Sequence, residues 1–181
     1  MAESLEKQLA KILSADVKMD NGKTVKQNLE SAIDYLYDCI DKYIQQYYLS
    51  YTPSVYKRTY DFQDSLYAEN IAQARIVGNR IELSISFMDS MSYHRNIFDD
   101  HDSYVPALIN FGWDAPKLKS LIGEAKHRFT YYEGYHFIER AIRMFNRSNP
   151  YGVYISPSDV TYIHDGSSTK TKNSFKWNFN V

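Results

Sequence analysis

The sequence predicts an α+β protein that contains one long helix and an antiparallel β-hairpin. Two patterns predict this class. Apolar residues recur at alternating steps of four and three between residues 29 and 47, as on one face of a helix, whereas apolar and polar residues alternate strictly over residues 81–87, as in a half-buried strand. The chain has 181 residues, 44% of them hydrophobic and 24% charged, which is the size and composition of one globular domain.

Charge and cysteine content exclude several classes of protein. The 21 basic and 22 acidic residues nearly balance, so the chain lacks the overall positive charge of a sequence-independent nucleic-acid binder. The single cysteine, Cys39, excludes an intramolecular disulfide and a four-cysteine zinc site. No apolar run approaches the roughly 18 residues of a membrane span, and residues 1–13 are charged and amphipathic, unlike a signal peptide. We therefore expect a protein made in a cytoplasm, with no membrane partner.

Tyrosine is unusually frequent, with 17 residues against 7 glycines. Its ring combines a large apolar face with a polar tip, which suits surfaces that meet another protein. Filling a β-rich core is an equally good explanation, and the sequence does not decide between the two.

The long helix is predicted to begin after residue 24 and to end near residue 50, ahead of a proline. A short helix over residues 4–14 and a turn at residues 20–22 precede it and form an N-terminal unit, 1–22. Thr24 and Gln27 have the spacing of a capping box. The apolar seam of the long helix consists of Leu29, Ile33, Leu36, Ile40, Tyr43 and Tyr47.

Three aspartates, Asp34, Asp38 and Asp41, lie together on a flank of this helix, well away from the seam. The simplest interpretation is a solvent-exposed face that keeps the protein soluble. The alternative is a face turned toward a partner or toward a passing polyanion.

The middle of the chain predicts a hairpin, a loop and a short apolar element. Strands are expected over residues 66–77 and 81–87, joined by the two-residue turn Gly78-Asn79. Residues 89–103 are polar and predict a loop, and residues 105–113 form a short apolar element that ends at a glycine.

The last part of the chain predicts two helices and a second hairpin. A brief helix is expected over residues 117–126 and a clearer one over residues 134–146. The inner face of the second helix consists of Phe137, Ile138, Ala141, Ile142 and Phe145, and the opposite face of Arg140, Arg143 and Arg147. We expect a core domain over residues 23–150 and a C-terminal hairpin extension over residues 151–181.

The residues that could carry catalysis form no recognisable motif. His94, Asp99, Asp100, His101 and Asp102 are metal-ligand types, but their spacing matches no metal motif, and a polar loop explains them better. Cys39 falls inside the long helix beside its apolar seam, with no positioning glycine near it, and the scattered glycines form no phosphate-binding loop. We therefore expect no enzyme and no cofactor. The arginine face could follow phosphates, but such faces more often pair with carboxylates.

The order of the segments resembles the neck proteins of tailed bacteriophages, the head-tail joining or tail-completion family, also described as minor capsid or tail components. The resemblance covers residues 27–149. It is carried by a long helix followed by Tyr51-x-Pro53-x-x-Tyr56-x-Arg58-Thr59 and Ser65-Leu66, then a hairpin, then Val105-Pro106-Ala107-Leu108-Ile109-Asn110-x-Gly112, and then Phe137-Ile138-x-x-Ala141. It implies a helix on a curved antiparallel sheet, a Ser-Leu pair entering the first strand, an apolar strand ending in a glycine turn, and a late helix after an aromatic residue.

The resemblance also implies a structural virion protein in the connector ring between head and tail. Its partners would be copies of itself and other neck or tail proteins, with DNA passing through the channel, and it would be made in the cytoplasm of a bacterial host. The alternatives are a metal-dependent hydrolase or nuclease using His94, His101 and the adjacent aspartates, and a small adaptor for a host protein. The candidate partner contacts are Ile97, Phe98, Trp177, Phe179, Arg140, Arg143 and Arg147, and the candidate channel-facing residues are Asp34, Asp38 and Asp41. The competing expectation for the C-terminal residues is that the tail folds back onto its own sheet.

Overall fold

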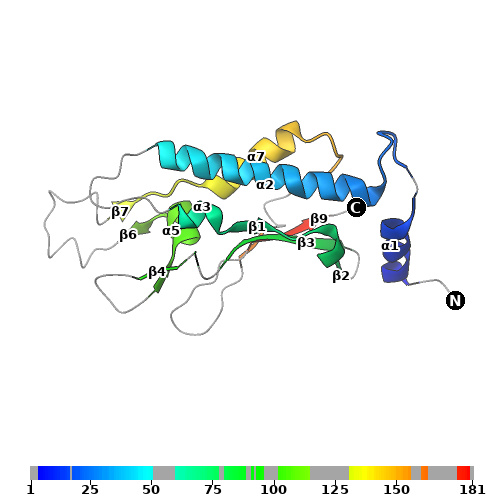
Figure 1. Cartoon of the computed structure of the whole chain (residues 1–181), viewed down its shortest axis with the longest axis horizontal. Coiled ribbons are helices and arrows are strands. Elements are labelled where there is room, and N and C mark those ends of the chain that lie inside the picture. Colours follow the sequence, from blue (N-terminus) through cyan, green and yellow to red (C-terminus); the bar gives the residue numbers. More distant parts are fainter. Residues whose placement is uncertain are drawn as a thin grey trace, which may run out of the picture.

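The chain has the predicted α+β fold, with helices over one face of an antiparallel sheet (Figure 1). The computed structural model describes residues 4–16, 18–50, 60–77, 80–88, 91, 93–95, 102–114, 131–155, 160–162 and 175–179. Two helices run along the sheet, and a third, near the N-terminus, stands across one end of it (Figure 1).

The long helix, α2 (Val25–Leu49), begins and ends as predicted. Thr24 and Gln27 form the capping box: Thr24 Oγ1 accepts from the Gln27 N–H at 3.2 Å, and Gln27 Oε1 accepts from the Thr24 N–H at 2.9 Å. The short helix α1 (Leu5–Ser14) precedes it and contacts α2 and the sheet.

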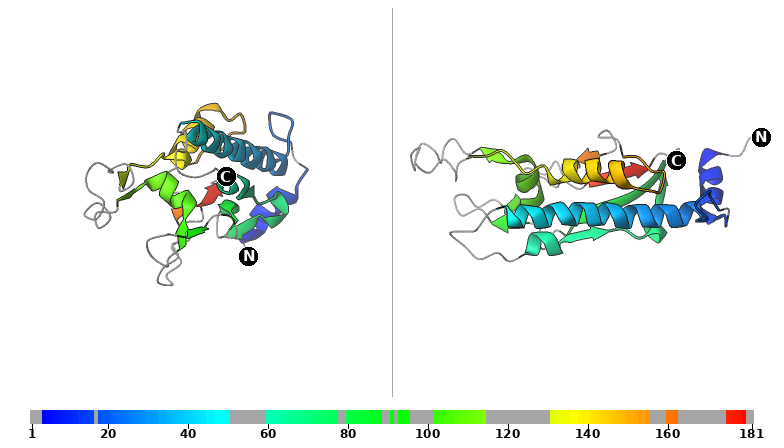
Figure 2. Two further views of the ribbon diagram at one scale, coloured as in Figure 1. Left: turned by 60° about the vertical axis from the view of Figure 1, so that its left-hand side comes forward. Right: turned by 90° about the horizontal axis from the view of Figure 1, so that it is seen from above.

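The buried face of α2 is wider than the predicted seam, because the helix has neighbours on two sides. Helix α7 (Phe137–Ser148) lies on one side, and the short helix α3 (Asp61–Asp64) with the first strand lies on the other (Figure 2). The predicted seam lies within this face: its first four residues are buried, and Tyr43 and Tyr47 are half-buried and pack against the core. The buried residues of α2 are Asn28, Leu29, Ala32, Ile33, Leu36, Cys39, Ile40, Ile44 and Tyr48.

The main sheet has five antiparallel strands, and the central one is the predicted strand over residues 81–87. The strands are β1 (Leu66–Ala68), β2 (Arg75–Val77), β3 (Arg80–Phe87), β8 (Val160–Tyr162) and β9 (Phe175–Phe179). Their order is β1-β3-β9-β8, and β2 also pairs with β3. The Ser65-Leu66 pair leads into β1 as expected, and Val77 pairs with Arg80, as the predicted hairpin requires. The turn residues Gly78 and Asn79 lie outside the described residues.

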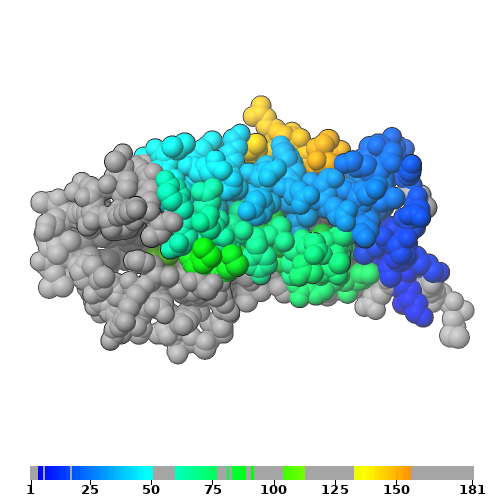
Figure 3. Space-filling model, viewed as in Figure 1, coloured from blue at the N-terminus to red at the C-terminus, as the bar shows by residue number. Residues whose placement is uncertain are grey.

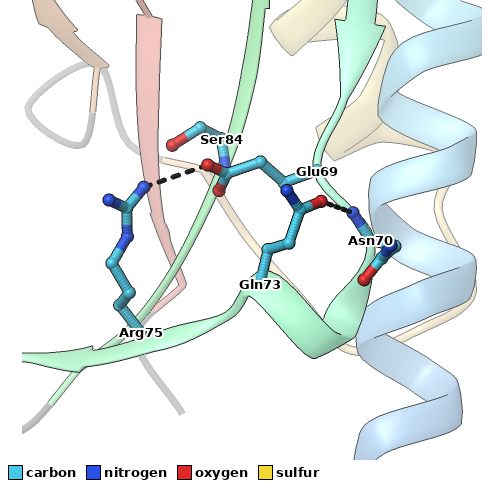
Figure 4. Close-up of polar contacts among 5 residues, drawn as sticks. All are labelled: Glu69, Asn70, Gln73, Arg75 and Ser84. Atoms are coloured by element: carbon cyan, nitrogen blue, oxygen red, sulfur yellow. Dashed lines mark hydrogen bonds and ion pairs between the residues drawn. The ribbon is translucent and has the colours of Figure 1, made fainter.

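The prediction of one continuous strand over residues 66–77 is wrong. A 3₁₀ turn, η1 (Ile71–Gln73), separates β1 from β2, and Glu69 bridges the gap. The backbone of Glu69 donates to the carbonyl of Ser84 at 2.8 Å, and Oε2 of its side chain accepts from the Ser84 N–H at 2.8 Å. Oε1 of the same carboxylate pairs with Arg75 at 3.0 Å (Figure 4). A side chain thus replaces the strand hydrogen bond that the break removes.

Two further expectations are corrected between residues 89 and 112. Part of the predicted loop forms a strand pair, β4 (Tyr93–Arg95) with β5 (Asp102–Tyr104). The apolar segment forms a helix, α5 (Val105–Phe111), where the resemblance implied a strand. A short apolar run suits either element, and the proline in the first turn favours the helix. The expected glycine ends it, since Gly112 has a φ of 81°.

The last segments return to the core. Strand β6 (Trp113–Asp114) pairs with β7 (Tyr131–Tyr132), which leads into α7; the helix expected over residues 117–126 lies outside the described residues. The side chain of Asn146 holds the irregular segment 151–155 on α7, donating to the carbonyl of Ile155 at 2.7 Å and accepting from its N–H at 2.9 Å. Strand β9 pairs with both β3 and β8, so the backbone of the C-terminal hairpin belongs to the main sheet.

Candidate functional site

The three aspartates on the flank of α2, Asp34, Asp38 and Asp41, are called the acidic strip here. Asp34 and Asp38 are exposed, whereas Asp41 is half-buried. Asp41 accepts hydrogen bonds from Gln45 at 2.6 Å and from Gln63 of α3 at 2.8 Å. The strip therefore borders the side of α2 that carries α3.

Negative charge at this edge of the molecule extends onto α3, where Asp61 and Asp64 are exposed. α2 and α3 adjoin on the face shown in Figure 3. The phenol of Tyr37 lies close to these carboxylates. Burial is the largest cause that raises its pKa above the usual value, and the carboxylates of Asp41, Asp38 and Asp64 raise it further. Carboxylates of both α2 and α3 thus act on the same phenol.

The three arginines of α7, Arg140, Arg143 and Arg147, are called the basic strip here. They lie opposite the buried face of the helix, as predicted. Arg143 and Arg147 are exposed, and within the described part of the chain neither forms an ion pair. Arg140 is half-buried, and its guanidinium carbon lies 4.2 Å from the centre of the Tyr135 ring, a cation–π contact.

The two strips belong to opposite sides of the helical layer. Gln63 of α3 donates a hydrogen bond to Asp41, and the Tyr37 hydroxyl of α2 donates to the carbonyl of Leu66, so α3 and β1 lie on this side of α2. On the other side of α2, Tyr35 contacts Phe145 of α7, with ring centres 5.9 Å apart. Seen from above, α3 and α7 flank α2 on opposite sides (Figure 2). The acidic strip therefore lies on α2, with Asp41 next to α3, and the basic strip lies on the helix that flanks the other side of α2.

Of the four apolar candidates for partner contact, the structure describes the backbone of two. Ile97 and Phe98 lie outside the described residues. Trp177 and Phe179 belong to β9, and in the register they stand opposite Leu83 and Ile81, which are buried residues of β3. At the level of the backbone, the expectation that the tail folds back onto its own sheet holds. Their side chains are not among those described.

The metal hypothesis gains no support from the described residues. His94 and Asp102 lie on the paired strands β4 and β5, while Asp99, Asp100 and His101 lie outside the described residues. Among the residues that are described, no three histidine, cysteine, aspartate or glutamate side chains are grouped to hold a metal ion.

Cys39 is unsuited to nucleophilic catalysis. Its side chain is 1% exposed, and burial raises the pKa of the thiol to about 11. At neutral pH the group is a thiol, whereas the thiolate is the reactive form.

Many of the described tyrosines line the core, a use that the sequence left open. Tyr48 is buried and contacts Tyr60 and Phe62 at the end of α2, with ring centres 5.0 and 6.3 Å apart. Tyr47 contacts Tyr135 just before α7, at 5.5 Å. Sequence reasoning missed this cluster, because its members lie far apart in the chain.

No family model, curated protein or solved structure matches this chain. In the part of the chain that the structure describes, no helix is both long and apolar enough to cross a membrane.

Proposed function

We propose that this chain is a structural virion protein of a tailed bacteriophage, a subunit of the connector ring that joins head and tail. The observation that carries the proposal is the junction between two segments on which the resemblance depends. Asn110, in the segment 105–112, binds the backbone of Ile138 at the start of the helix over 137–148, with Oδ1 and N 3.0 Å apart. This bond holds the two segments together as one structural unit, with the first segment forming a helix and not the strand that the resemblance implies.

Two further features support the proposal. A long helix covers an antiparallel sheet, and Ser65-Leu66 leads into its first strand, as the resemblance implies. The acidic strip on α2 and the basic strip on α7 are the kind of unlike surfaces that a ring subunit needs, because each face in a ring meets a different face of the next copy.

The test is to disrupt the gene in the phage that encodes this chain. We expect lysates with DNA-filled heads and separate tails, seen by electron microscopy, and we expect mass spectrometry to find the chain in purified wild-type virions. A plasmid copy should restore infectious particles. A copy with Ile40→Asp, which disrupts the core, should not restore them, whereas a copy with the exposed change Lys26→Ala should. Complete virions without the chain would refute the proposal.

A further inference from the structure

We propose that the basic strip of one copy of this chain packs antiparallel against the acidic strip of a second copy. The inference rests on the proposed function only in assigning this contact to the connector ring; the contact itself joins two copies of one chain.

The two strips match in length and in spacing. Asp34, Asp38 and Asp41 are separated by steps of four and three residues, and the arginines by steps of three and four. Each strip covers seven residue steps of helix, about 10 Å. When two helices lie antiparallel, the residue order of one is reversed relative to the other. The three-and-four spacing of the arginines then matches the four-and-three spacing of the aspartates. The pairs are then Asp41 with Arg140, Asp38 with Arg143, and Asp34 with Arg147.

The antiparallel arrangement follows from the direction of the helices in the subunit. Helices α2 and α7 run in opposite directions (Figures 1 and 2). Rotation about an axis parallel to the helices leaves their directions unchanged. In a ring around such an axis, α7 of one copy therefore meets α2 of the next copy in the antiparallel orientation that the spacing requires.

The placement of the strips makes the contact repeatable. Because the acidic strip borders α3 and α7 lies on the other side of α2, a copy that uses its basic strip keeps its acidic strip free for a third copy. Such a contact between unlike surfaces closes into a ring when the rotation between copies divides a full turn.

The surroundings of the basic strip suit a protein partner. A single exposed ion pair contributes little, so the contact depends on three aligned pairs and on apolar area beside them. Tyr154 supplies such area: it is 65% exposed and precedes Ile155, which Asn146 binds to α7. Arginine and tyrosine are enriched in protein interfaces. Arg140 can contribute while stacked on Tyr135, because stacking leaves the edge of the guanidinium free for a carboxylate.

The competing use of the acidic strip is to line a DNA channel. That use gives the basic strip no partner, whereas the contact between strips engages both. The matched spacing therefore favours the contact between copies.

Charge reversal tests the inference on the full chain, with sedimentation velocity at low and high salt. Wild-type protein should associate at low salt and dissociate at high salt. Arg143→Glu with Arg147→Glu, and separately Asp34→Lys with Asp38→Lys, should each weaken association by more than about tenfold. Combining all four changes in one chain should restore association, and so should mixing the two double variants. The matched control, Lys7→Glu with Lys26→Glu, reverses two exposed charges elsewhere and should leave association unchanged.

Disulfide trapping supplies a second measurement. A chain with Asp38→Cys and Arg143→Cys should form a ladder of covalent oligomers on mild oxidation, and a chain with Lys26→Cys and Arg143→Cys should not. A monomeric wild type without such a ladder would overturn the inference, as would failure of the fourfold variant to associate. Duplex DNA binding that depends on Arg143 and Arg147, without self-association, would also overturn it.

These outcomes are separable from failure of the proposed function. Presence of the chain in virions, together with reversal variants that assemble normally, would refute the contact and leave the function standing. Strip-dependent association of a chain that is absent from virions would refute the function and leave the contact standing.

Discussion

Oδ1 of Asn110 accepts a hydrogen bond from the backbone N–H of Ile138 at 3.0 Å and so caps α7 from outside that helix. The residue at the N-cap position itself, His136, has a left-handed backbone with φ 54° and makes no side-chain cap. The side-chain nitrogen of Asn110, Nδ2, donates to the carboxylate of Glu139 at 3.2 Å. The backbone carbonyl of Asn110 accepts a hydrogen bond from the backbone N–H of His136 at 3.0 Å. One fully buried side chain thus joins α5 to the start of α7.

Asn110→Ala should lower the free energy of unfolding by about 2 to 3 kcal/mol, because it leaves the buried N–H of Ile138 without its acceptor. Urea denaturation followed by circular dichroism measures this loss. The control is Asn70→Ala, which removes the exposed cap of η1 and should cost less than about 1 kcal/mol. Equal losses in the two variants would contradict the capping role of Asn110.

Gly134→Ala should destabilise the same junction more strongly. Gly134 has a φ of 101°, and an added Cβ would lie 2.6 Å from the carbonyl oxygen of Asn110 and 2.7 Å from the carbonyl carbon of Phe111. Both are backbone atoms and have little room to move, so we expect a loss of at least about 3 kcal/mol in the unfolding free energy. Gly152→Ala is the control: its φ is 70°, but no atom lies within 4 Å of an added Cβ. Gly152→Ala should lower the unfolding free energy by about 1 to 2 kcal/mol. A similar loss for Gly134→Ala would show that the backbone around Asn110 can move away from Gly134.

Glu69→Ala should lower the free energy of unfolding more than Arg75→Ala, which removes the ion-pair partner of Glu69. The change leaves the buried Ser84 without an acceptor for its N–H, at about 1 to 3 kcal/mol. Arg75→Ala removes only an exposed ion pair, which contributes less than about 1 kcal/mol. Chemical denaturation of the two variants measures the difference. If Arg75→Ala is the more damaging change, the carboxylate acts through the ion pair and not through the strand.

Regular periodicity predicted most of the fold. The four-and-three spacing of α2, its capping box and the alternation in β3 are local signals, and all three elements form where they were expected. The helix at residues 105–111 could not be separated from a strand, because a short apolar run fits both periods. The break between β1 and β2 escaped prediction because Glu69 replaces a backbone hydrogen bond with one from its side chain.

The candidate site was predictable in part. The acidic and basic strips follow from helical spacing alone, and the structure places both on the outer faces of their helices. Their location on opposite sides of α2 depends on how α3 and α7 pack, which no pattern within either helix encodes. The cap from Asn110 to Ile138 was hidden for the same reason, since 28 residues separate its partners.

Ile40→Asp and Asp38→Ala test the orientation of α2. Ile40 is 1% exposed, so an aspartate there would bury an unpaired charge and cost several kcal/mol, about the stability of a marginal domain. Asp38 is exposed, and its replacement by alanine should change the melting temperature little. The melting temperatures of both variants, measured by thermal unfolding, compare the buried face of α2 with its exposed face. Similar melting temperatures would mean that the helix is rotated relative to the sheet.

Cys39 should make the protein less stable at high pH. Burial raises the pKa of its thiol from 9.0 to about 11, so the unfolded chain loses this proton at a lower pH than the folded chain does. The stabilisation is therefore complete below about pH 9 and is lost as the pH rises toward 11, by up to about 2 to 3 kcal/mol. Urea denaturation at pH 8, 9, 10 and 11 measures the slope, and Cys39→Ala should remove this part of it. Tyr37 adds its own loss, because its phenol pKa is also raised, from 10.0, and Tyr37→Phe isolates that contribution. A Cys39→Ala variant with the same pH dependence as the wild type would mean that water reaches the thiol and that α2 opens readily at its buried face.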